Sequence, residues 1–252
     1  MPIVLAIACC SLLIAASPSH AQSTACGVST ALTLSAGVGQ NDRVDATASP
    51  FQFRGRGLEL SVNAAHSSGR VCMTLDAGGG TKLLSTREGT SATERLAEGD
   101  AGFGVLRTTW MRSLSIGAEA RGELAITDHA YTDPRHIVAT YRIGALSFGP
   151  AARWQRRFGR GDAVVQLSAP VVALIDHPYF AVWSTDPQPT FRLASVGEYR
   201  AAHAAFSYSW TAWRGVASVL SYRVNGVRYD DVHPLRSLSQ SLTVGAHMPF
   251  AP

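Results

Sequence analysis

The sequence predicts an all-β fold, a single antiparallel transmembrane β-barrel of about twelve strands, with ten or fourteen strands as alternatives. Apolar and polar residues alternate with a period of two in many segments, which is typical of strands with one apolar face. Beyond residue 21, no apolar run reaches the length of about 18 residues that a membrane helix needs. The chain has 46% hydrophobic and only 16% charged residues, which suits a barrel with an apolar outside and a polar inside.

Twelve segments show this alternation. Residues 112–125 show it most clearly, with Leu114 and Ile116 on one face and Glu119 and Arg121 on the other. The predicted strands are residues 31–40, 56–66, 70–78, 100–109, 112–125, 136–148, 151–158, 163–174, 190–200, 203–212, 216–229 and 238–250.

The predicted connections alternate between long and short. Residues 41–55, 79–99 and 126–135 are long, whereas 67–69, 110–111 and 149–150, a Gly-Pro turn, are short. Long loops at one rim and tight turns at the other are typical of transmembrane barrels. Residues 159–162 and 175–189 interrupt the alternation, and for this reason ten and fourteen strands remain alternatives.

The N-terminus has the features of an export signal. Residues 3–16 form an uncharged apolar run, Ser17-Pro18 ends it, and Ser19-His20-Ala21 is a small-x-small cleavage site. We therefore expect residues 1–21 to be a signal peptide and residues 22–252 to form the barrel domain.

The last predicted strand gives a second indication of where the protein is located in the cell. Its apolar positions are Leu242, Val244, Ala246, Met248 and Phe250. This pattern resembles the C-terminal strand of bacterial outer-membrane β-barrels, which typically ends in Phe or Trp; here two further residues follow the Phe. The resemblance implies the outer membrane of a Gram-negative cell, contact with its lipids, and these five residues as the signal for the barrel-assembly machinery.

If the apolar faces meet lipid, the opposite faces line the lumen. Charged residues of both signs fall on those faces, and they would either pair into a structural network or form the constriction of a narrow, porin-like solute channel. The set is Glu59, Asp76, Glu119, Arg121, Glu123, Arg142, Arg153, Arg157, Arg223 and His247.

Two other function classes stay open beside a passive, structural or channel role. His66-Ser67-Ser68-Gly69 resembles the His-x-Ser-x-Gly core of outer-membrane phospholipase A, with the Gly one place early. His66 and Ser68 would be the catalytic pair of a lipid hydrolase. Their predicted place at a short turn, away from the outer leaflet, favours a non-enzymatic protein. A surface binding or adhesion protein would use residues 41–55 and 79–99.

Two cysteines remain after residue 21, Cys26 and Cys72, and an even pair in an exported protein predicts a disulfide. We expect no metal site, because there is neither a Cys-x-x-Cys motif nor a His cluster at ligand spacing. We expect no cofactor. The net charge of +4 comes from scattered Arg residues without a clustered basic face, which argues against nucleic-acid binding.

Overall fold

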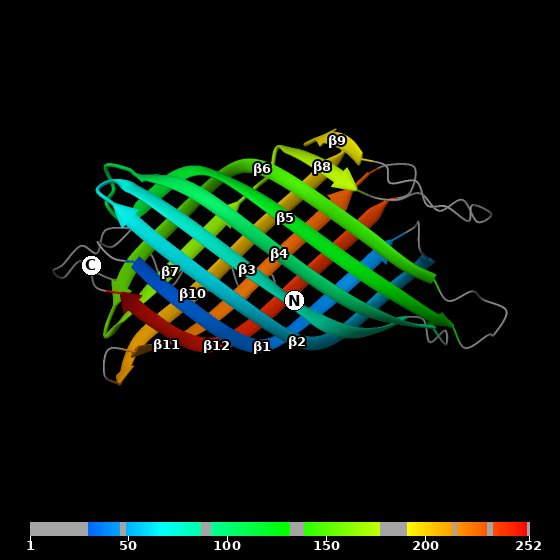
Figure 1. Cartoon of the computed structure of the whole chain (residues 1–252), viewed down its shortest axis with the longest axis horizontal. Helices are drawn as coiled ribbons and strands as arrows, with labels where there is room; N and C mark the ends of the chain where they lie inside the picture. The colour runs from blue at the N-terminus through cyan, green and yellow to red at the C-terminus, as the bar shows by residue number, and fades with distance from the viewer. Residues whose placement is uncertain are drawn as a thin grey trace.

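Ten antiparallel strands close into a barrel in the computed structural model of the chain, and two short strands lie outside that ring (Figure 1). The structure describes residues 30–45, 49–86, 92–131, 139–176, 191–213, 216–230 and 234–250. The barrel strands are β1 (Thr30–Asp45), β2 (Ser49–Ser68), β3 (Val71–Thr86), β4 (Ala92–Thr108), β5 (Leu114–Tyr131), β6 (Ala139–Phe158), β7 (Gly161–Ser168), β10 (Tyr199–Trp213), β11 (Val216–Tyr229) and β12 (Leu235–Phe250). The outside strands are β8 (Val172–Asp176) and β9 (Phe191–Ser195). The prediction of an all-β antiparallel barrel is confirmed, and ten strands, one of the alternatives, form the ring.

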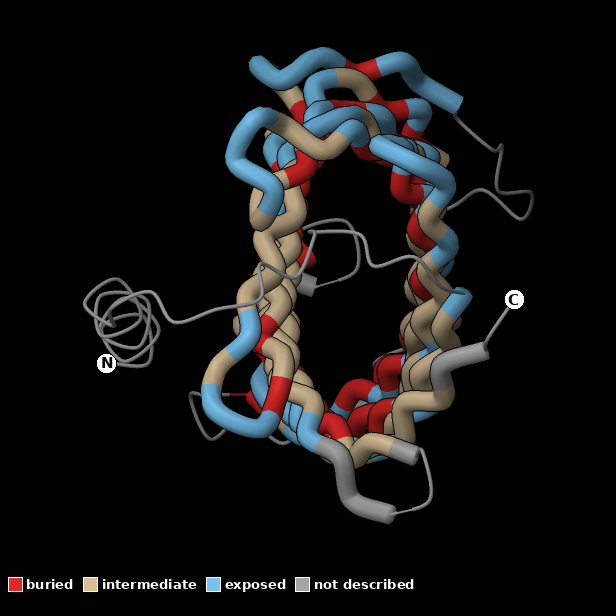
Figure 2. The backbone as a smooth tube through the Cα atoms, turned by 90° about the vertical axis from the view of Figure 1, so that its left-hand side faces the viewer, coloured by how far each residue is buried: buried red, intermediate tan, exposed pale blue. Residues whose placement is uncertain are grey.

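The ring closes because each of its ten strands pairs with a neighbour on both sides along at least part of its length. β1 pairs with β2 on one side and with β12 on the other, and the pairing of β5 with β6 completes the circuit. Seen along its axis, the ring is oval (Figure 2). Thr30 pairs with Phe250, so both described ends of the chain lie at one rim, as an even number of strands requires.

The two faces of the wall differ in polarity, and β3 shows how the sequence produces this. Cys72, Thr74 and Asp76 are buried and face the lumen, whereas Met73 is 45% and Leu75 54% exposed on the outside. A barrel in water would bury its apolar side chains inside. The apolar face therefore points outward, as it does in barrels that sit in lipid. No helix in the described parts of the chain is long and apolar enough to cross a bilayer.

The expected turn at Gly149-Pro150 is wrong, because both residues lie inside the continuous strand β6 and pair with Glu119 and Ala118 of β5. A proline normally breaks a central strand, since it has no N–H to donate. Here the Pro150 carbonyl accepts from the Ala169 amide at 3.1 Å, just after the end of β7. The side of Pro150 that lacks an N–H therefore faces a point where no ladder hydrogen bond from β7 is needed. Gly149 fits the same point, because a Cβ there would collide with the backbone of Ala169 and Pro170.

Because two predicted strands merge into β6, the turn after it, residues 159–160, lies at the rim of the chain ends together with residues 69–70 and 109–113. Gly69 and Gly159 adopt φ values of 60° and 57°, which favour glycine in tight hairpin turns. The opposite rim is formed by the other ends of the strands, for example Asp45 of β1, Thr86 of β3 and Ala92 of β4.

The long loops expected at residues 41–55 and 79–99 are for the most part strand. β1 continues to Asp45, β2 begins at Ser49, β3 continues to Thr86 and β4 begins at Ala92. These segments carry glycine and charged residues that suggest loops in a sequence. In the barrel, the charged side chains face the lumen and the glycines leave room for them: a Cβ on Gly78 would meet the guanidinium of Arg223.

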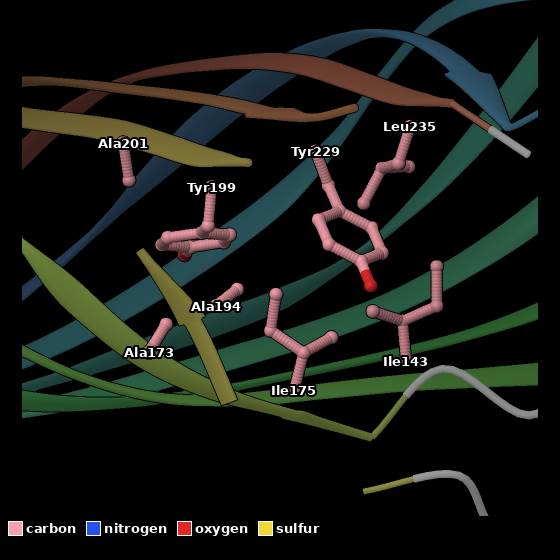
Figure 3. Packing of buried hydrophobic residues seen from close by; sticks show 8 residues of the cluster. All are labelled: Ile143, Ala173, Ile175, Ala194, Tyr199, Ala201, Tyr229 and Leu235. Atoms are coloured by element: carbon pink, nitrogen blue, oxygen red, sulfur yellow. The ribbon is translucent and has the colours of Figure 1, made fainter. Parts of the chain in front are cut away.

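β8 follows β7 in the chain after residues 169–171, and β9 precedes β10, separated from it by residues 196–198. β8 pairs with β6 at Gly144–Phe148 and with β9 on its other side. Next to β8 and β9, apolar side chains from several strands pack against one another inside the barrel (Figure 3). Tyr199, Tyr229 and Leu235 come from β10, β11 and β12, and Ile143 and Ile175 come from β6 and β8. This apolar cluster fills part of the lumen near the rim opposite the chain ends.

Candidate functional site

Arg121 of β5 is the centre of a buried group of charges near the middle of the barrel. Its guanidinium donates to Asp76 on β3 at 2.7 Å and to Glu119 on its own strand at 2.8 Å. It also donates to Asp100 on β4. The side chains of Arg121, Asp76 and Glu119 are at most 7% exposed. One guanidinium thus binds three carboxylates from three neighbouring strands.

Lys82 of β3 is the second buried cation. Its ammonium lies 3.2 Å from Glu59 on β2 and also donates to Glu98 on β4. Glu98 in turn accepts from Asn41 of β1 and from Ser239 of β12, both at 2.9 Å. Five different strands therefore meet at this carboxylate and its cation.

Arg223 of β11 connects opposite walls. Its guanidinium lies 3.4 Å from Asp100 on β4. In the order of the ring, β4 and β11 are five strands apart in either direction, so they face each other across the bore. A direct ion pair between them therefore runs across the full width of the lumen.

Two further carboxylates, Glu123 and Glu119, connect the charged residues to β10 and β7. Glu123 accepts from the Tyr199 hydroxyl at 3.2 Å and lies 3.3 Å from His203, both of β10. Glu119 accepts from Gln166 and Ser168 of β7, each at 3.1 Å.

We call the nine charged residues of this cross-section the charged layer: Glu59, Asp76, Lys82, Glu98, Asp100, Glu119, Arg121, Glu123 and Arg223. Six of them are carboxylates and three are cations.

Two cavities lie on either side of the charged layer. One of about 190 Å³ extends to the rim of the chain ends and is lined mainly by hydroxyl and amide side chains. The other, of about 100 Å³, lies against the apolar cluster and includes Tyr199 and Tyr229 in its lining. In the described ranges, no three His, Cys, Asp or Glu side chains are grouped to hold a metal ion.

Solved structures of known barrels share this architecture. The outer membrane protease OmpT from Escherichia coli superposes with a TM-score of 0.51 at 8% identity, over 88% of this chain and 97% of that one. The fold is that of a bacterial outer-membrane β-barrel. The translocator domain of the autotransporter NalP from Neisseria meningitidis matches at 13% identity and a TM-score of 0.45, over 87% of this chain and 88% of that one. The β domain of the Bordetella autotransporter BrkA matches at 11% identity and a TM-score of 0.46, over 88% and 100%.

These likenesses concern the fold alone, because the identities are too low to carry an activity from one protein to another. Neither the protein-family models nor the curated proteins include a match to this chain.

Most of the residues that the sequence assigns to the lumen lie on the inner face of the barrel. Glu59, Asp76, Glu119, Arg121, Glu123 and Arg223 belong to the charged layer. Arg153 and His247 line the cavity of about 190 Å³. Arg157 follows Arg153 on the same face, but it is exposed, two residues before the turn at the rim.

The lumen assignment of Arg142 is wrong. Its side chain is 54% exposed and pairs with Asp176 at 2.9 Å. Because β6 runs unbroken through Pro150, the inward positions of Ile143 and Ser147 fix the even-numbered residues of this stretch on the outer face.

Sequence reasoning missed Lys82, Glu98 and Asp100 as members of the site. Lys82 and Glu98 fall in the expected loop at residues 79–99. A signal was present, because Lys82 alternates with Leu83 in the same inward and outward order as the rest of β3. Glu98 and Asp100 are likewise two residues apart on β4.

The structure places the other predicted site residues near the rim of the chain ends. His66 and Ser68 are exposed, and the His66 ring accepts or donates a hydrogen bond with Thr30 at 3.0 Å. No hydrogen bond joins His66 to Ser68 in the described part of the chain, so nothing in the geometry favours a catalytic pair.

In β12, Leu242 and Val244 face outward, 47% and 60% exposed, and Ala246 and Met248 are half-buried. Phe250 ends the strand, and its side chain lies outside the described residues, as does the predicted signal peptide. Cys72 is buried and disulfide-bonded. Cys26 lies outside the described residues, so the pairing of Cys26 with Cys72 stays a prediction.

Proposed function

We propose that this protein is an integral outer-membrane barrel whose bore is closed by its own side chains, and that it serves as a structural component rather than an open pore. The observation that carries the proposal is the ion pair between Arg223 and Asp100, which joins opposite walls at 3.4 Å. Around it, Arg121, Lys82 and Glu98 occupy the same cross-section with direct contacts between strands. These paired charges fill much of the cross-section of a ten-stranded ring and leave only a cavity of about 40 Å³ beside Asp76, Arg121 and Arg223.

The outward apolar face supports insertion in a membrane. Leu58, Leu60 and Val244 are 60–70% exposed, and similar residues occur around the ring. Soluble proteins rarely expose an apolar surface of that extent. Outer-membrane lipids and the barrel-assembly machinery are the partners that this proposal requires, with export directed by residues 1–21. The mature protein is expected in the outer-membrane fraction, with a gel mobility that changes on heating; recovery from the periplasm as a soluble protein contradicts the proposal.

Conductance across a planar lipid bilayer tests the closed bore. The purified wild-type barrel is expected to give no stable conductance steps. Arg223→Ala removes the side chain that crosses the lumen and is expected to produce steps or to make them more frequent. Arg228→Ala is the matched control, because Arg228 lies on the same strand, is 47% exposed and, in the described part of the chain, forms its ion pair with Asp230, two residues along. Stable steps from the wild-type protein contradict a closed bore.

A narrow solute channel is the second candidate, and the two cavities on either side of the charged layer favour it. In that case the layer is a constriction between two wider chambers. Because carboxylates outnumber cations in the layer, small wild-type conductance with a preference for cations is the outcome that supports the channel.

A further inference from the structure

Arg153 of β6 is a cation that forms no ion pair with any residue in the described part of the chain. It lies in the wall of the cavity of about 190 Å³, between the charged layer and the rim of the chain ends. Its guanidinium Nε is shielded from solvent and has no hydrogen-bond partner. Its neighbours across the ladder are neutral, Ser115 on β5 and Gln166 on β7.

Arg223, the second cation in the cavity lining, lies against Asp100. Asp162, the carboxylate in the described lining, stands opposite Arg157 in the register of β6 and β7, four residues along β7 from Gln166, the neighbour of Arg153. His247 shares a hydrogen bond of 2.9 Å with Thr33. The described turns at this rim, residues 69–70, 109–113 and 159–160, contain neither Asp nor Glu.

The remainder of the cavity is a surface of hydrogen-bonding groups. Hydroxyl side chains line it from β1, β2, β10, β11 and β12; they are Ser35, Ser61, Ser207, Ser221, Ser241 and Thr243. Hydroxyls both donate and accept, so they suit a ligand that carries hydroxyl groups as well as a charge. A shielded guanidinium without an anion is unfavourable, and a phosphate or carboxylate would supply the bidentate partner that Arg prefers.

We propose that this cavity binds a small hydroxylated anion, with its phosphate or carboxylate on Arg153 and its hydroxyl groups on the surrounding Ser and Thr side chains. The ligand enters from the rim of the chain ends. The site goes beyond the proposed structural role and does not depend on it, since a closed charged layer only forms the floor of the cavity.

Isothermal titration calorimetry of the folded barrel in zwitterionic detergent tests the site. The probes are glycerol 3-phosphate and inorganic phosphate, with glycerol as the neutral control. Saturable binding is expected for the two anions and none for glycerol at the same millimolar concentrations. Arg153→Gln is expected to weaken anion binding at least about tenfold, the loss of roughly one charge-assisted contact. Arg156→Gln, which removes an Arg from over the Phe158 ring on the same strand, is expected to leave binding unchanged.

A stability measurement separates loss of the site from loss of the fold. Without ligand, Arg153→Gln is expected to unfold at the same or a higher urea concentration than the wild type, because it removes an unpaired charge. Addition of glycerol 3-phosphate should then stabilise the wild type and not the variant. If Arg153→Gln does not fold, Arg153→Lys keeps the charge and should retain weaker binding of phosphate. Absence of saturable anion binding by the wild type, or equal binding by Arg153→Gln, overturns the proposal.

Discussion

Removal of the Arg121 guanidinium is the sharpest test of how the interior is held together. Arg121→Leu replaces the guanidinium with a shorter apolar side chain and leaves three carboxylates, Asp76, Glu119 and Asp100, without their shared cation. Two of these contacts are 2.7 and 2.8 Å long and buried. Removal of one partner from a buried ion pair costs about 3–5 kcal/mol, and hydrogen bonds to the same cation are not additive, so we expect a loss within that range.

Urea unfolding of the barrel in phospholipid vesicles, followed by tryptophan fluorescence, measures the loss. Arg142→Leu is the control, because the ion pair of Arg142 with Asp176 is half exposed and should contribute about 0–1 kcal/mol. Adding Asp76→Asn and Glu119→Gln to Arg121→Leu should recover much of the stability, since the unpaired charges are then gone. The reasoning is refuted if Arg121→Leu unfolds within about 1 kcal/mol of the wild type, the range of a surface pair.

Three further predictions concern the wall and the chain ends. Val244→Arg places a charge toward lipid and should destabilise the barrel by about 2–4 kcal/mol, whereas Thr243→Arg points into the polar cavity and should cost less in the same urea assay; equal effects would show the faces to be reversed. Phe250→Ala should reduce the amount of folded barrel on immunoblots of outer membranes, and an unchanged amount speaks against an assembly signal at that residue. Mass spectrometry of non-reduced peptides should detect Cys26 linked to Cys72, closing a loop of about 45 residues worth ~4 kcal/mol in the chain-entropy model; two free thiols exclude the bond.

The period-two alternation was enough to predict the strands and, in most of them, their faces. It succeeds where each side chain meets either lipid or lumen, as at Val244 and Thr243. It fails where a residue is chosen for a partner on a distant strand. Pro150 is typical of a turn when only local sequence is considered, but in the barrel it lies beside the interruption between β7 and β8. Gly78 is likewise typical of a loop, but in the barrel it leaves room for the guanidinium of Arg223 of β11.

The charged layer shows the same limit. Alternation places Glu119 and Arg121 on the inner face, but it does not say that Arg223 reaches Asp100 from the opposite wall. That contact depends on the closure of ten strands into a ring of a particular width and stagger. Lys82 and Glu98 were hidden for a different reason, since charges and glycines in one stretch favour a loop when only local sequence is considered.

The two short strands outside the ring have a consequence for how the barrel opens. A closed sheet has no place from which to unzip, because each strand is held on both sides. Among the described residues, β9 pairs with β8 alone, and β10 pairs with β7 from His203 onward, so Tyr199 to Ala202 pair with a described strand on one side only. Local opening should therefore begin at this seam, and amide hydrogens of β9 should exchange with solvent well before those of β1 or β3. We therefore expect global unfolding to require disruption of the ten-stranded ring, whereas local opening, the more frequent motion, involves β8 and β9.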